Sequence, residues 1–291
     1  VHNTGRLFIA NQPRSVWELL GSCGRMRGLR VMFKIGNPGC PCCGLCACYS
    51  FDETGEDAAG TKDLTATNPL YTAGKLNQAA SFAGSSDFSH AHNNCFSPAA
   101  SNTWRMWFWF RLDAVPTFDA NGGYQGVITK GAANYAPGSP AVTTFDGEWG
   151  VFWRTPSSGY TGAEGDSGLP LIFSYKSDSV ATGVHHRTTI EKDVWYFFHW
   201  TLNKSDNDGT IYGRRSSDNA DAGTTNAFRG TMSTDAGTSL YVGKNTGTNG
   251  ENLGENSGAF SIDNVGFSSK IGSAASLYNS GNGKRCPYAG T

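Results

Sequence analysis

Two segments of this chain carry aromatic or aliphatic side chains at both odd and even positions. Residues 104–112 read Trp-Arg-Met-Trp-Phe-Trp-Phe-Arg-Leu, and residues 194–202 read Val-Trp-Tyr-Phe-Phe-His-Trp-Thr-Leu. Successive side chains of a β-strand point to opposite faces, so a strand that is apolar at both parities has to be covered on both faces. We therefore predict that these two segments are strands buried between two layers of structure.

The rest of the chain alternates apolar runs with turn-forming stretches. Residues 148–154 and 169–175 share the aromatic character of the two central segments, whereas residues 131–144 and 155–168 are dense in Gly, Asn, Asp, Ser or Pro. Glycine accounts for 38 of the 291 residues, which suits many short strands joined by tight turns. A short helix is predicted only over residues 271–278. The predicted fold class is all-β, with two antiparallel sheets forming a sandwich.

Several short motifs resemble the concanavalin A-like superfamily, and in particular its laminin-G-like jelly-roll domains. Residues 125–131 (Gln-Gly-Val-Ile-Thr-Lys-Gly) resemble the Gly-x-Ile-Ser-Lys-Gly strand of that family, and residues 195–198 (Trp-Tyr-Phe-Phe) resemble its Trp-Tyr strand. Residues 51–87 and 261–281 resemble its first and last strands. The resemblance implies a jelly roll in which these early and late segments pair within one sheet.

The resemblance also implies the domain boundaries. Residues 47–283 are expected to form one jelly-roll domain, since all-β sandwiches of 200 to 250 residues often remain single domains. A tail and Cys-rich segment (1–46) precede it, and a short tail (284–291) follows. Residues 1–31 lack the pattern of a secretory signal peptide, and we expect them to be either a tail or a short helix that docks on the sandwich.

Charge and hydropathy limit the partners of the chain. Lys and Arg number 23 against 24 acidic residues, so the formal net charge is -1 and gives no electrostatic basis for binding nucleic acid or an anionic membrane. No apolar run approaches the roughly 20 residues that a membrane-spanning helix needs. The balanced charge favours a neutral partner, and the family resemblance implies that this partner is a glycan or a surface protein.

The sequence offers little for catalysis. Glycoside hydrolases of this superfamily need two carboxyl groups that flank the scissile bond, but Glu148 and Asp263 each stand alone in their predicted strands. The Gly-Asp-Ser-Gly motif at residues 165–168 resembles the nucleophile motif of chymotrypsin-like proteases, without the accompanying His and Asp motifs. His199 lies between two aromatic residues, as a histidine within a sheet does. We predict that the chain is not an enzyme.

The cysteines form an unusual cluster. Five of the eight fall within nine residues, at Cys40, Cys42, Cys43, Cys46 and Cys48. One hypothesis is a structural zinc site, in which Cys40, Cys43 and Cys46 are joined by Cys95. His90, His92 and Cys286 are alternative fourth ligands. The other hypotheses are disulfides to distant partners and free thiols. In each case the expected role is to fasten this segment to the sandwich.

A calcium site is a further expectation from the resemblance. Laminin-G-like jelly rolls often hold calcium at an edge of the sandwich, and the corresponding acidic residues here are Asp263, Asp52, Asp57 and Asp63. Calcium prefers six to eight oxygen ligands, which acidic turns can supply. The alternative is that Asp52 and Asp263 accept hydrogen bonds from backbone N–H groups at strand ends.

The family resemblance implies a binding function. Ligands of such domains lie on rim loops or on a sheet face, where an aromatic ring stacks on a sugar. The predicted ligand-binding residues are Tyr124, Tyr135, Trp153, Tyr160, Asn245 and Asn249. The first hypothesis is a carbohydrate-binding or adhesion module at an extracellular, cell or virion surface. The alternatives are an assembly protein of a phage or cell-surface particle and, third, a polysaccharide hydrolase.

Overall fold

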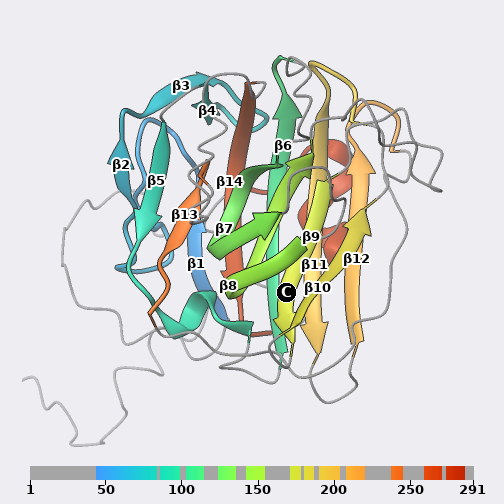
Figure 1. The fold of residues 1–291 in the computed structure, drawn as a ribbon. Coiled ribbons are helices and arrows are strands. Elements are labelled where there is room, and N and C mark those ends of the chain that lie inside the picture. The colour runs from blue at the N-terminus through green and yellow to red at the C-terminus, as the bar shows by residue number, and fades with distance from the viewer. Residues whose placement is uncertain are drawn as a thin grey trace, which may run out of the picture. The chain divides into compact units, whose positions relative to one another are not determined.

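Two antiparallel sheets face each other across an aromatic core in the computed structural model (Figure 1). The structure describes residues 44–83, 86–98, 103–114, 124–135, 142–154, 171–177, 180–186, 190–203, 208–219, 237–244, 259–270 and 273–285. All of them fall within one unit that spans residues 36–291. The predicted fold class, a two-sheet antiparallel sandwich, is confirmed. The domain boundaries at residues 47 and 283 stay predictions.

The back sheet has seven strands. In spatial order these are β12 (Asp208–Arg215), β11 (Trp195–Asn203), β6 (Thr103–Leu112), β14 (Phe260–Ser268), β4 (Gln78–Phe82) and β3 (Leu70–Ala73), and β1 (Leu45–Tyr49) also pairs with β14. The front sheet, which is nearer the viewer in Figure 1, also has seven. Its order is β10 (Val180–His186), β9 (Leu171–Ser177), β8 (Val142–Arg154), β7 (Tyr124–Tyr135), β13 (Leu240–Val242), β5 (Asp87–His90) and β2 (Thr65–Thr67).

The two ends of the described chain meet in the back sheet. Strand β14 pairs with β1, where Tyr49 lies opposite Val265, and with β4, where Ala80 lies opposite Ile262. Its other neighbour is β6. The predicted pairing of early and late segments is therefore confirmed, and it places a late strand at the centre of the back sheet.

Strand β6 shows why its sequence is apolar at both parities. Trp104, Met106 and Phe108 belong to the core between the sheets, whereas Trp107 and Trp109 lie on the outer face of the back sheet and are also fully buried. The helix α1 (Ala274–Tyr278) packs on that outer face through Leu277 and Tyr278. Figure 1 shows this helix behind the back sheet. The helix predicted at residues 271–278 is thus present and covers the second face of the central strands.

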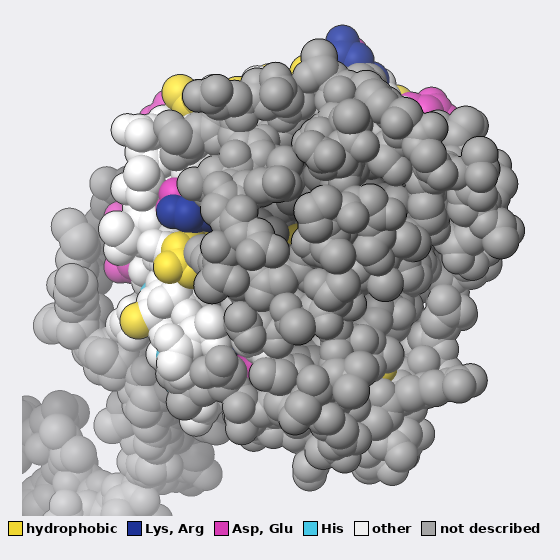
Figure 2. Space-filling model, in the orientation of Figure 1, with side chains coloured by type: hydrophobic (Ala, Val, Ile, Leu, Met, Phe, Trp, Pro, Cys, Tyr) yellow, Lys and Arg dark blue, Asp and Glu magenta, His cyan; other side chains and the backbone are white. Residues whose placement is uncertain are grey.

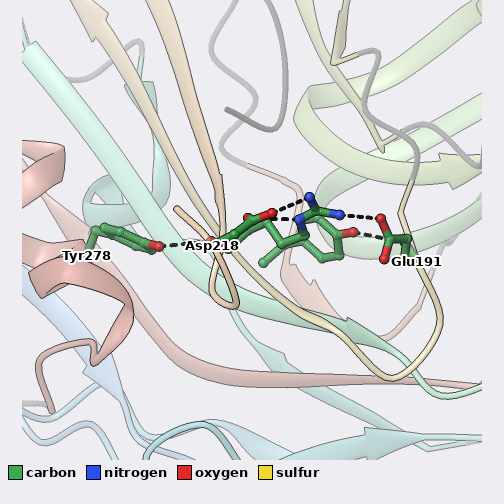
Figure 3. A network of polar contacts seen from close by, with 5 residues as sticks. Glu191, Asp218 and Tyr278 are labelled. Carbon is green, nitrogen blue, oxygen red and sulfur yellow. Dashed lines mark hydrogen bonds and ion pairs between the residues drawn. The ribbon is translucent and has the colours of Figure 1, made fainter. Parts of the chain in front are cut away.

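A polar network holds the helix against the loop that follows β12 (Figure 3). The hydroxyl of Tyr278 donates to the carbonyl oxygen of Arg215 (2.9 Å). The guanidinium of Arg215 donates to Asp218 through Nε (2.9 Å) and also pairs with Glu191. Because these charged side chains are partly exposed, we expect the ion pairs to add little stability. The network links α1 to the end of β12.

Indole groups fix a short turn at one end of the core. The rings of Trp104 and Trp149 lie 5.2 Å apart between centroids. Trp104 Nε1 donates to the carbonyl oxygen of Cys95 (3.2 Å), and Trp149 Nε1 donates to that of Phe96 (2.7 Å). Both acceptors belong to the 3-10 helix η2 (Asn94–Phe96), which follows β5.

Among the described residues, no helix has the length and apolar character that a membrane-spanning segment requires.

Candidate binding face

The outer face of the front sheet carries a polar strip around one aromatic ring. On β13, Leu240 and Val242 are buried in the core, so Tyr241 between them points outward, where it is half-buried. On β5, Phe88 belongs to the core, and Asp87 and Ser89 therefore lie on the outer face. Local alternation of side chains thus brings Tyr241 to the surface.

The strands beside Tyr241 present small or hydroxyl side chains in the same row. Tyr241 lies opposite Ser89 on β5 and opposite Thr129 on β7. Ser89 in turn lies opposite Thr65 on β2, and Thr129 lies opposite Gly150 on β8. The row therefore reads Thr65, Ser89, Tyr241, Thr129 and Gly150 across five neighbouring strands. Because its neighbours are small, the phenol ring is the largest side chain in this row.

A lysine and an aspartate lie next to the ring. Lys244 Nζ is 5.7 Å from the centroid of the Tyr241 ring and 3.5 Å from Asp87 Oδ2. The lysine side chain is 37% exposed and the aspartate side chain 9%. Tyr241, Asp87 and Lys244 thus converge on one spot, which we call the Tyr241 face.

The backbone fixes the position of Lys244. Thr129 Oγ1 donates to the carbonyl oxygen of Lys244 (2.9 Å). Gly243 has a φ of +88°, and a Cβ on it would lie 2.1 Å from the ring of Phe82, so only glycine fits there. Its N–H donates to the carbonyl oxygen of Val127 (2.9 Å). These contacts hold the turn after β13, and the Lys244 side chain lies over the Tyr241 ring.

Figure 2 views the molecule from this side. Its coloured part over β2, β5 and β13 is mostly white, which marks backbone and side chains that are neither charged nor hydrophobic. Basic, acidic and hydrophobic side chains lie close together within it. An aromatic ring offers a stacking surface, a carboxylate accepts hydrogen bonds and an ammonium group donates them. This is the set of groups that a polyhydroxylated ring such as a sugar requires, since it has apolar C–H faces and a rim of hydroxyl groups.

Three of the predicted ligand-binding residues lie in the front sheet. Tyr124 pairs with Arg154 at one end of the β7–β8 ladder, Tyr135 pairs with Val142 at the other, and Trp153 lies opposite Leu171. For these residues the structure describes the backbone. Tyr160, Asn245 and Asn249 lie outside the described residues. Sequence reasoning missed Tyr241, although the Leu-Tyr-Val alternation with a following glycine was a signal for an outward-pointing aromatic residue.

Two of the predicted calcium ligands hold the turn after β1. Asp57 Oδ1 accepts hydrogen bonds from the N–H groups of Cys48 and Ala59 (2.9 Å each). Asp63 Oδ1 accepts from the N–H of Asp57 (2.9 Å). Both carboxylates therefore bind backbone donors.

The other two predicted calcium ligands lie near the start of β4. Asp263 Oδ2 accepts from the N–H of Leu76 (2.7 Å), and Asp52 Oδ1 accepts from that of Gln78 (3.2 Å). Asp263 is fully buried, and burial raises its pKa to about 7, with a smaller contribution from the nearby charge of Asp52. Within the described ranges, no group of three or more His, Cys, Asp or Glu side chains could hold a metal ion. The four aspartates bind the backbone, as the alternative interpretation of Asp52 and Asp263 has it, and calcium binding stays a prediction.

One cysteine of the cluster forms a disulfide with a distant cysteine. Cys46 in β1 is joined to Cys95 in η2, with their Cα atoms 5.5 Å apart. This is the disulfide alternative for these two residues, and structural zinc binding by the cluster stays a prediction. Cys48 is also disulfide-bonded, whereas Cys40 and Cys43 lie outside the described residues. The Cys46–Cys95 bond connects a strand of the back sheet to the turn that follows a strand of the front sheet.

Comparison with known structures finds two proteins of similar fold. The binding domain of Paraclostridial Mosquitocidal Protein 1 is similar over 80% of this chain and 50% of its own, with 12% identity and a TM-score of 0.50. A botulinum neurotoxin type C structure, from a toxin whose cell entry depends upon interaction with two ganglioside molecules, is similar over 81% and 50%, with 11% identity and a TM-score of 0.51. At this identity the likeness shows the fold alone.

A Trypanosoma rangeli sialidase is similar over 82% of this chain and 32% of its own, with 14% identity and a TM-score of 0.47. A similarity this low says nothing about the activity of this chain. The chain thus spans about half the length of the toxin binding structures and about a third of the sialidase. No protein-family model matches the chain, and no curated protein matches its sequence.

Proposed function

We propose that this chain is a non-catalytic module that recognises carbohydrate at a cell or particle surface. The observation that carries the proposal is the convergence of Tyr241, Asp87 and Lys244 on the outer face of the front sheet. The ring provides a stacking surface for the apolar face of a sugar, and the ion pair provides an acceptor and a donor for its hydroxyl groups. The fold likeness to toxin binding domains supports this assignment.

The disulfide supports a location outside the cytosol. Disulfides persist in oxidising compartments and are rare where glutathione and thioredoxin keep thiols reduced. Cys46 and Cys95 are joined, and Cys48 is disulfide-bonded as well. We therefore propose that the chain acts at an extracellular, cell or virion surface.

A glycan array with the full chain tests the proposal, followed by calorimetry with the best ligand. We expect binding to a defined set of glycans, a loss of about tenfold or more in affinity in Tyr241→Ala, and no release of reducing sugar. Leu70→Ser is the matched control, because Leu70 is 48% exposed on β3 of the opposite sheet. Stable oligomers with no glycan bound would instead support the assembly protein, and sugar release would support the hydrolase.

A further inference from the structure

We propose that the ligand of the Tyr241 face is a short, uncharged sugar epitope, about two sugar rings in extent, and that its hydroxyl groups bridge Asp87 and Lys244. This inference rests on the proposed function and names the ligand class for the same site. It follows from the width of the exposed strip and from the charge balance within it.

The exposed part of the row is narrow. Thr65 is exposed, and Ser89 and Tyr241 are half-buried, whereas Thr129 on the next strand is fully buried. Beyond it, the ring of Phe152 lies over Gly150, since a Cβ on that glycine would be 2.4 Å from the ring, and Phe152 is itself fully buried. The strip therefore runs from β2 to β13, which is two strand spacings or about 10 Å. That length accommodates the end of a glycan better than an extended polysaccharide chain.

The charges on this strip balance. Among the residues of β2, β5 and β13 and the following residues 243–244, Asp87 is the acidic residue and Lys244 the Lys or Arg. They form an ion pair at 3.5 Å, so the negative charge of the aspartate already neutralises the positive charge of the lysine. A sugar carboxylate or sulfate placed beside Lys244 would lie close to Asp87 and be repelled by it.

A hydroxyl group suits the same pair. Because a hydroxyl both donates and accepts, it can donate to Asp87 Oδ2 while it accepts from Lys244 Nζ, with the two charged groups held close together. Hydrogen bonds to charged groups are shorter and stronger than neutral ones. The Tyr241 ring, 5.7 Å from the same ammonium group, contacts the C–H face of that sugar. Neighbouring hydroxyl groups on one ring would engage Ser89 and Thr65.

The effect of Asp87→Asn separates an uncharged ligand from an anionic one. If hydroxyl groups donate to the carboxylate, this change lowers affinity by about tenfold or more, because a charge-assisted hydrogen bond is lost. If the ligand is anionic, the same change raises affinity, because it frees Lys244 and removes a repulsive charge. Lys244→Gln lowers affinity for either ligand class, so it tests the site alone; should Asp87→Asn fold poorly, the comparison of neutral with acidic glycans on the parent chain separates the two classes.

The experiment uses the full chain and glycans matched in length, with neutral, sialylated, uronic acid and sulfated termini. We expect binding to neutral termini, affinity that stops rising beyond a disaccharide, and little change between 50 and 500 mM NaCl. Binding confined to acidic glycans, or affinity that keeps rising with chain length, overturns this inference and leaves carbohydrate recognition standing. Absence of binding to every glycan overturns both.

Discussion

Lys130 Nζ lies 2.9 Å from Glu148 Oε1, and both side chains are fully buried. The pair lies where the β7–β8 ladder shifts register, between the Lys130–Trp149 and Gly131–Gly147 pairs, so that Glu148 is the extra residue of a bulge. The bulge thereby brings a carboxylate next to a buried lysine. Removal of one partner leaves a buried charge without its ion-pair partner, which costs stability in the poorly polarisable interior.

We expect Lys130→Met to lower the free energy of unfolding by about 3–5 kcal/mol. The double variant Lys130→Met/Glu148→Leu should recover most of this loss, because apolar side chains of similar volume replace the pair. Urea unfolding of the two single variants and the double variant measures the coupling. Additive losses in the double variant would show that the pair does not act as a unit.

The raised pKa of Asp263 predicts that stability falls as pH rises from about 4 to about 7. Its pKa in the folded chain is raised to about 7, well above the usual value of 3.8, because burial disfavours the charged carboxylate. Its stabilising contribution is therefore complete below about pH 4 and is lost as pH rises to about 7. Since one pKa unit corresponds to about 1.4 kcal/mol, the loss is at most about 4 kcal/mol. Asp263→Asn should remove this dependence, with Tm at pH 5 and pH 8 as the measurement.

His199 predicts the opposite slope in acid. Burial, with a smaller effect from the charge of Arg105, lowers the pKa of His199 from 6.5 to about 3. Between pH 6.5 and about 3 the imidazole is protonated in the unfolded chain and neutral in the folded chain. The free energy of unfolding therefore decreases as pH falls through this range. His199→Gln should flatten the acid limb of a Tm profile between pH 3 and 7. An unchanged acid limb would mean that the imidazole is charged in the folded chain.

The disulfide should contribute strongly to stability. Cys46 and Cys95 are 49 residues apart in sequence. A disulfide that closes a loop of this size reduces the conformational entropy of the unfolded chain and thereby stabilises the folded state by about 4 kcal/mol. The variant Cys46→Ser/Cys95→Ser should show this loss in guanidinium unfolding without added reductant. The serine variant avoids reduction of Cys48, which is also disulfide-bonded. Equal midpoints of the variant and the parent would contradict the assignment.

Sequence patterns predicted the two-layered fold because the direction of each side chain along a strand depends only on the local backbone. Residues 104–112 carry apolar side chains at both odd and even positions, which indicates that both faces of the strand are covered. The helix α1 covers one of these faces. The pairing of early and late segments came from a family resemblance. The pairing of Cys46 with Cys95 stayed open among several alternatives, because spacing along the chain does not reveal which distant sulfurs approach one another.

The Tyr241 face depended on tertiary structure. Asp87 begins β5, Tyr241 is the middle residue of β13, and Lys244 lies in the turn after β13. Sheet pairing brings these two segments together, and neither carries a binding motif of its own. Burial of Asp263 likewise results from the loop at residues 74–76 and the neighbouring strands. The sequence by itself determined which side chains point inward and which outward along each strand, because that alternation is a property of the local backbone. Tertiary structure decided which outward side chains became neighbours, because register between strands distant in sequence depends on the packing of the whole core.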